Sequence, residues 1–191
     1  MNYTEGMFEN PEQYGVTDDK AHSCFFTGHR KILTAHKPEL LMRLKSAISY
    51  LYAKGVVNFY AGGALGFDTL AATQILDMRR EHAGMRLILE LPYTNQCERW
   101  EESEKRIYYF LRGEADEVHY AAERNAENAA EARKLLLARN RALAASSLYC
   151  VSYFSGARGG TAYTVALAEK NGCEMINLYP SREQPFLKEN R

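Results

Sequence analysis

The chain has 191 residues, with 24 Lys and Arg against 24 Asp and Glu, so its formal net charge is zero. This length suffices for one domain with a substantial core, and a neutral chain lacks the basic face that a broad electrostatic grip on nucleic acid needs. No two of the four cysteines have the spacing of a zinc site. We therefore expect a small-molecule partner, no nucleic acid and no metal ion.

The hydropathy of the chain predicts no association with a membrane. Residues 1–20 are polar and lack the apolar run of a signal peptide, and no apolar stretch is long enough to span a bilayer. We expect a cytoplasmic protein without a membrane partner. It is predicted to have an N-terminal arm over residues 1–21, one domain over 22–180 and a polar C-terminal tail over 181–191.

Apolar strands and periodic helices alternate along the predicted domain. In chain order we expect a strand over residues 23–27, a helix over 38–54, a strand over 56–60, a helix over 67–82, a strand over 86–92, a helix over 99–111, a strand over 115–120, a helix over 130–146, a strand over 148–154, a helix that ends near residue 171, and a strand over 174–178. Residues 121–129 are polar and stay unassigned.

This alternation indicates right-handed crossovers, and hence an α/β fold with a mostly parallel sheet of about six strands. The strands are apolar on both sides, which is typical of a sheet covered on both faces. Unusual loops follow three of them, at residues 28–30, 62–68 and 155–161. Because ligands bind such sheets beyond the carboxyl ends of the strands, we predict a nucleotide-like site where these loops meet.

The first glycine-rich loop contains Gly62, Gly63 and Gly66 and leads into a helix. Strand, glycine-rich turn and helix form the geometry of a phosphate cradle, in which backbone N–H groups approach the ligand. Asp68, in the first helical turn, could reach a ribose hydroxyl. The alternative is a tight turn in which Asp68 pairs with the helix dipole. The loop follows the second strand and lacks a Gly-Lys-Ser/Thr sequence, so it matches neither the dinucleotide fingerprint nor a Walker A loop.

The second glycine-rich loop ends in Gly159, Gly160 and Thr161, which predict another anion cradle at a helix start. Arg139, on the preceding predicted helix, could clamp a phosphate with two hydrogen bonds; the alternative is a surface salt bridge. Asn140 could bind a loop carbonyl or the ligand.

Two further groups complete the predicted site. Thr27, Gly28, His29 and Arg30 end the first strand, and Arg30 could reach the same anion. Gln96 and Trp100 are one helical turn apart in the sequence and are expected on one helix face. Trp100 could stack on a base, although a Trp at a helix start more often packs in the core.

Five motifs of this chain stand in the same order as in YpsA-like proteins, which the chain resembles. They are Cys24–Arg30, Gly62–Asp68, Pro92 with Gln96 and Trp100, Arg139-Asn140-Arg141, and Gly159-Gly160-Thr161. The resemblance covers residues 23–178. YpsA-like proteins belong to the SLOG superfamily, with the DNA-processing protein DprA/Smf and the LOG-type phosphoribohydrolases that release cytokinins. The resemblance implies a three-layer Rossmann-like fold that binds a nucleotide or nucleotide-derived ligand.

The chain departs from these relatives at two positions. LOG-type hydrolases carry a catalytic glutamate in a turn of the form PGGxGTxxE, and Thr164 stands in its place here. Their arginine on the preceding helix is matched by Arg139. YpsA-like relatives often have an aspartate near the end of that helix, where this chain has Ala145.

The first functional hypothesis is a sensor or regulatory domain that binds an AMP-like or ADP-ribose-like ligand, with no certain cofactor. The second is an N-glycosidase acting on a nucleoside monophosphate, with Asp68 as its catalytic carboxylate and Glu90 as a weaker candidate. The third is a DprA-like DNA-binding module, which the neutral charge disfavours. Catalysis and assembly into a homo-oligomer stay open.

Overall fold

The computed structural model describes residues 20–180. The predicted C-terminal tail, and all but the last two residues of the predicted arm, lie outside this range. The six strands are β1 (Ser23–Gly28), β2 (Asn58–Ala61), β3 (Arg86–Tyr93), β4 (Glu117–Ala122), β5 (Tyr149–Tyr153) and β6 (Glu174–Asn177). The helices are α1 (Lys37–Ala53), α2 (Phe67–Met78), α3 (Glu102–Glu114), α4 (Ala129–Ser146) and α5 (Gly160–Lys170), with short 3-10 turns η2 (Lys20–His22) and η3 (Thr34–His36).

The strands form one sheet in the order β4-β3-β2-β1-β5-β6. All of its pairings are parallel. A helix connects each strand to the next, because parallel neighbours need a crossover. The predicted α/β fold with a parallel sheet of six strands is therefore confirmed.

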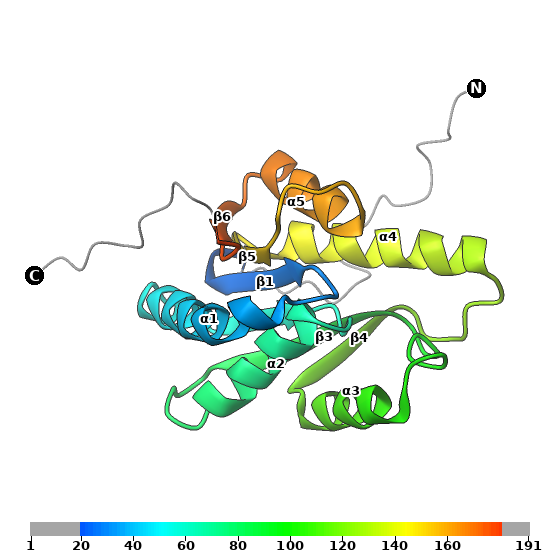
Figure 1. Ribbon diagram of the computed structural model, residues 1–191, viewed down its shortest axis with the longest axis horizontal. Coiled ribbons are helices and arrows are strands. Elements are labelled where there is room, and N and C mark those ends of the chain that lie inside the picture. Colours follow the sequence, from blue (N-terminus) through cyan, green and yellow to red (C-terminus); the bar gives the residue numbers. More distant parts are fainter. Residues whose placement is uncertain (1–19, 181–191) are drawn as a thin grey trace, which may run out of the picture.

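The sheet lies between two layers of helices (Figure 1). Helix α2 packs on β1, β2 and β3 with α1 and α3 beside it, while α4 and α5 contact each other on the opposite face. Alternate residues of β1 serve the two layers: Phe26 joins the core under α1–α3, and Phe25 joins the core under α4 and α5. This two-sided burial explains why the strands show no alternation of polar and apolar residues.

The order of the strands reverses beside β1. Strand β2 pairs on one side of β1 and β5 on the other. Helix α1, which follows β1, and helix α5, which follows β5, leave toward opposite faces of the sheet (Figure 1). A crevice at the carboxyl ends of β1 and β5 results.

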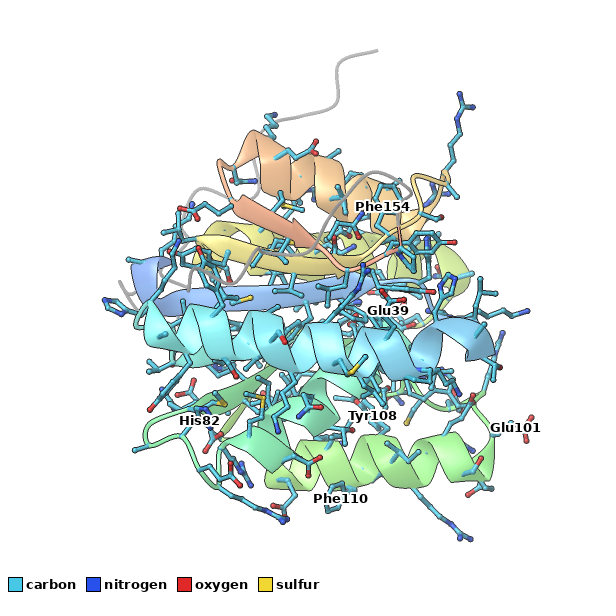
Figure 2. All side chains as sticks on the ribbon, turned by 60° about the vertical axis from the view of Figure 1, so that its left-hand side comes forward. Glu39, His82, Glu101, Tyr108, Phe110 and Phe154 are labelled. Carbon is cyan, nitrogen blue, oxygen red and sulfur yellow. The ribbon has the colours of Figure 1, made fainter. Side chains whose placement is uncertain are left out.

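Two helix boundaries differ from the prediction for local reasons. Helix α3 begins at Glu102 rather than residue 99 because Glu101 caps it: the Glu101 side chain accepts from the Glu104 amide, and the Glu104 side chain accepts from the Glu101 amide. Figure 2 shows Glu101 at this end of α3, with Tyr108 turned inward and Phe110 outward. Helix α2 ends at Met78, whose carbonyl oxygen lies 2.9 Å from His82 Nδ1. His82 thus follows α2 instead of belonging to it.

Candidate functional site

A cavity of about 740 Å³ opens at the crevice between the loops after β1, β2 and β5 and the helices α4 and α5. This volume is in the usual range for small-molecule sites. The cavity is lined by Phe26, Thr27, Gly28, His29, Arg30, Ala64, Asp68, Arg133, Leu136, Leu137, Arg139, Asn140, Leu143, Gly159, Gly160, Thr161, Tyr163 and Thr164.

Arg139 is a buried arginine of the cavity wall whose hydrogen bonding is incomplete. Its side chain is 7% exposed, and its Nη1 lies 3.7 Å from Asp68 Oδ2, an ion pair too long for a hydrogen bond. Its Nε is buried without a hydrogen-bond partner within residues 20–180. Burial lowers the pKa of Arg139, and the charges of Asp68 and Glu90 oppose this shift. An arginine stays charged in such a site, so several donors await an acceptor.

Asp68 organises the loop between β2 and α2. Its Oδ2 accepts hydrogen bonds from the Gly62 amide at 3.1 Å and from the Ala64 amide at 3.4 Å. Burial raises the pKa of the Asp68 carboxyl, while Arg139 and the two amides oppose the shift. Asp68 therefore accepts hydrogen bonds from amides of the loop that was expected to bind a phosphate.

The glycines of this loop make room for the protein itself. A Cβ on Gly62 would overlap the Nη1 of Arg139, and one on Gly63 would lie 2.5 Å from the Cδ2 of Leu91. Gly66, with a φ of +84°, lies against the carbonyl of Arg30. None of these three glycines lines the cavity. In the structure they permit close packing, which corresponds to the tight-turn alternative.

His29 connects the loops after β1 and β5. Its Nε2 accepts a hydrogen bond from the Ser155 amide at 3.0 Å and lies 2.8 Å from Ser155 Oγ. Because an amide can only donate, Nε2 must carry the lone pair, and the ring proton is on Nδ1. The His29 amide also donates to the carbonyl of Tyr153 at 3.1 Å. His29 thereby holds the β5 loop at the edge of the cavity.

The start of α5 contributes first-turn amides, which have no partner within their own helix, to the cavity wall. Gly159 is its N-cap and supplies no side-chain cap, and Gly160 and Thr161 begin the helix. The first-turn amides of a helix have no partner within it and carry its positive dipole end. Thr164 is buried and donates its hydroxyl to the Gly160 carbonyl at 3.1 Å. The position of the hydrolase glutamate therefore carries a neutral hydroxyl that is bonded to its own helix.

Gln96 and Trp100 lie outside the cavity wall. Both precede α3, so the expectation that they share one helix face is wrong. The Gln96 side chain donates to the Gly63 carbonyl at 3.0 Å and so braces the β2 loop. The Trp100 ring packs edge-on against Tyr108, with centroids 5.4 Å apart. Trp100 thus takes the alternative role, packing against the core.

Glu90 is also engaged elsewhere. It lies on β3, and its Oε1 is 2.7 Å from Nδ1 of His119 on β4. The His119 Nε2 lies 3.0 Å from Glu117 Oε2. The hydrogen bond to Glu90 raises the pKa of His119, although burial opposes the shift. Glu90 lies outside the cavity wall, which weakens its case as a catalytic carboxylate.

The structure brings ten of the predicted site residues to one cavity and adds others that the sequence analysis did not select. The predicted ones are Thr27, Gly28, His29, Arg30, Asp68, Arg139, Asn140, Gly159, Gly160 and Thr161; the additions are Phe26, Ala64, Arg133, Leu136, Leu137, Leu143, Tyr163 and Thr164. A signal for some additions was available, because Arg133, Leu136, Leu137 and Asn140 have the spacing of one helix face.

The sheet order, the three layers and a cavity at the strand reversal define a Rossmann-like α/β protein. The model of the YspA SLOG family matches residues 25–175, and the chain belongs to this family. Within residues 20–180, no helix is long and apolar enough to cross a membrane.

Similar proteins include two curated UPF0398 proteins. One, from Halalkalibacterium halodurans, is 28% identical over 120 residues, which are 62% of this chain and 61% of that protein. Another, from Bacillus pumilus, is 28% identical over 95 residues, 50% of this chain and 49% of that protein. The chain thus matches about half to three fifths of the length of these relatives.

Two structures of DNA processing protein A share the fold. The Helicobacter pylori protein, whose structure concerns single-stranded DNA binding, has a TM-score of 0.60 at 19% identity and covers 86% of this chain and 68% of its own. The Streptococcus pneumoniae protein has a TM-score of 0.56 at 16% identity and covers 80% of this chain and 48% of its own. At these identities the likeness concerns the fold alone.

Proposed function

We propose that the chain binds a nucleotide or nucleotide-derived ligand, of the AMP or ADP-ribose type, in this cavity and acts as a sensor or regulatory domain. The observation that carries the proposal is Arg139, which is buried at the cavity: its Nε has no hydrogen-bond partner within residues 20–180, and its ion pair with Asp68, at 3.7 Å, is too long for a hydrogen bond. Burying a charge with incomplete hydrogen bonding is costly, and a phosphate would supply charge-assisted acceptors.

The surroundings of Arg139 favour an anion. Of the described residues that line the cavity, three are arginines, Arg30, Arg133 and Arg139, and one is a carboxylate, Asp68. The α5 start adds amides and a positive dipole end. A Cβ on Gly159 or Gly160 would meet nothing within 4 Å, so the space before these residues is open. Phosphate binding is therefore assigned to Arg139 and the second glycine-rich loop, with Asp68 left to accept from a sugar hydroxyl.

An N-glycosidase is the second candidate. Asp68 lines the cavity, and burial raises the pKa of its carboxyl, as a general acid requires. Against this role, Asp68 already accepts two amides and faces Arg139. A chromatographic assay for adenine released from AMP distinguishes the candidates, because a sensor leaves the glycosidic bond intact.

Calorimetry on the full chain tests the proposal with AMP, ADP-ribose, adenosine and a short single-stranded oligonucleotide. We expect AMP or ADP-ribose to bind at least tenfold more tightly than adenosine, since a phosphate contact is worth roughly 1.5–3 kcal/mol. Equal affinity for AMP, ADP-ribose and adenosine would contradict phosphate recognition. Tight binding of the oligonucleotide alone would favour the DNA-binding alternative, since the fold is shared with DNA processing protein A.

A further inference from the structure

Helix α4 presents an apolar band to the cavity between two polar positions. Arg133, Leu136, Leu137 and Asn140 recur at the spacing of one helix face, and all four line the cavity. Leu136 and Leu137 are only partly buried. With a rise of 1.5 Å per residue, Arg133 and Arg139 lie about 9 Å apart along the axis, with the two leucines between them. A ligand that binds only through phosphate leaves this band exposed to water.

Helix α5 adds an aromatic ring to the same wall. Tyr163 lines the cavity and is 37% exposed. Among residues 20–180, the ring is assigned to neither hydrophobic core, so core packing does not account for its place at the cavity. Helices α4 and α5 contact each other on one face of the sheet (Figure 1). Tyr163 and the two leucines line the same cavity.

We propose that Tyr163, Leu136 and Leu137 form a subsite for the base of the nucleotide, with its phosphate at Arg139. This inference rests on the proposed function and narrows its ligand class to compounds that carry a planar base. A base offers two flat apolar faces, and stacking on an aromatic ring does not require a particular base. A sugar phosphate has no such face. Trp100, the base-stacking residue expected from the sequence, packs on Tyr108 outside the cavity wall.

The test compares AMP with ribose 5-phosphate, which keeps the phosphate and lacks the base. Calorimetry on the full chain should show AMP binding at least about tenfold more tightly, as one stacked base is worth roughly that factor or more. Tyr163→Ala should remove most of this advantage and leave the affinity for ribose 5-phosphate within about twofold. Tyr163→Phe should retain the advantage, whereas Tyr163→Leu, apolar but not planar, should lose it.

The matched control is Tyr50→Ala, because Tyr50 is 41% exposed, on α1, and outside the cavity wall. It should change neither affinity. Equal binding of AMP and ribose 5-phosphate by the unmodified chain would overturn the base subsite and leave the phosphate site standing. Loss of both ligands in Tyr163→Ala would overturn it as well, because the ring would then act on the phosphate site. Binding of neither compound to the unmodified chain would overturn the proposed function and the subsite together.

Discussion

At the cavity, the burial of Arg139 and Asp68 lowers the stability of the protein but prepares Arg139 to bind an anion. Arg139 and Asp68 are both buried, and their ion pair at 3.7 Å is too long for a hydrogen bond. A buried ion pair offsets its desolvation only when its remaining polar atoms are satisfied. The residues within 20–180 do not satisfy those of Arg139, so this group is expected to gain most from a bound anion.

Arg139→Lys should therefore lower the affinity for AMP about tenfold and leave the affinity for adenosine nearly unchanged. Lysine keeps the charge and loses the planar fork that holds two phosphate oxygens. The measurement is calorimetry with both ligands. Arg141→Lys is the control, since Arg141 is exposed on the same helix outside the cavity. An equal loss for AMP and adenosine in Arg139→Lys would indicate that Arg139 acts through packing.

A substitution at Gly62 tests whether the loop after β2 is needed for close packing against Arg139. The φ of Gly62 is not positive, so alanine is tolerated by the backbone, but the new methyl would overlap the Arg139 guanidinium. We expect Gly62→Ala to cost about 1–3 kcal/mol in unfolding free energy and to weaken AMP binding by displacing Arg139. Urea unfolding and calorimetry measure the two effects. Gly113→Ala, in helix α3 with open space around it, should be neutral or stabilising. Full stability and affinity in Gly62→Ala would contradict the packing role.

The two glycine-rich loops show which features of the site the sequence predicts and which it does not. Glycines after a strand indicate a close approach, and the sequence correctly placed both loops near one sheet edge. What approaches Gly62 is Arg139, from a helix far along the chain, and no local pattern reveals such a contact. Tyr163 was overlooked for a related reason, because its exposure depends on how α4 and α5 pack.

At the scale of elements, the alternation of strands and helices predicted the parallel sheet but not the order of its strands. Six apolar runs separated by helical periods predicted the parallel sheet, since only crossovers connect such strands. The start of α3 differs from the predicted one because reciprocal capping by Glu101 and Glu104 decides it, and hydrophobic periodicity does not reveal such a cap. The shift removed Trp100 from the helix and hence from the predicted site.

The β3–β4 pair should make stability depend on pH through His119. Its pKa is raised in the folded state by the hydrogen bond to Glu90, so its stabilisation is complete below the unfolded pKa of about 6.5. This stabilisation is lost as the pH rises through the folded value. In urea unfolding, His119→Gln should cost about 1 kcal/mol more at pH 5.5 than at pH 9. A penalty that is the same at both pH values would mean that the His119 charge contributes nothing.

At the scale of the whole molecule, a ligand that binds only the folded chain must raise its thermal stability. At a concentration of 100 times the Kd, binding adds about 2.7 kcal/mol. For a chain of this size we expect AMP or ADP-ribose to raise the Tm by roughly 5–10 °C. Differential scanning calorimetry provides the measurement, with adenosine at equal concentration as the control. A Tm that is unaffected by saturating AMP and ADP-ribose would argue against both as ligands.

The sensor hypothesis also predicts that AMP survives prolonged incubation with the protein. Thr164 is buried and its neutral hydroxyl bonds to its own helix, so it cannot replace a catalytic carboxylate. Asp68 is fixed by two amides beside Arg139, an arrangement that suits accepting from a sugar hydroxyl better than transferring a proton. Loss of one positioned acid–base group costs about 10²–10⁴-fold in rate. Chromatography should show no adenine above the buffer control. Release of adenine that disappears in Asp68→Asn would instead establish Asp68 as a catalytic residue.

Because β5 pairs with β1, we expect the cavity to form late in folding. His29 and Ser155, which meet at its edge, are 126 positions apart in the chain. Contacts of such long range incur a large loop-closure entropy and form slowly. The cavity can appear only after β5 has docked beside β1, so a nascent chain that ends before α5 cannot hold the ligand. Ligand binding would thus report that β5 has joined the sheet. If the site forms after the folding transition state, a bound ligand should slow unfolding more than it speeds folding.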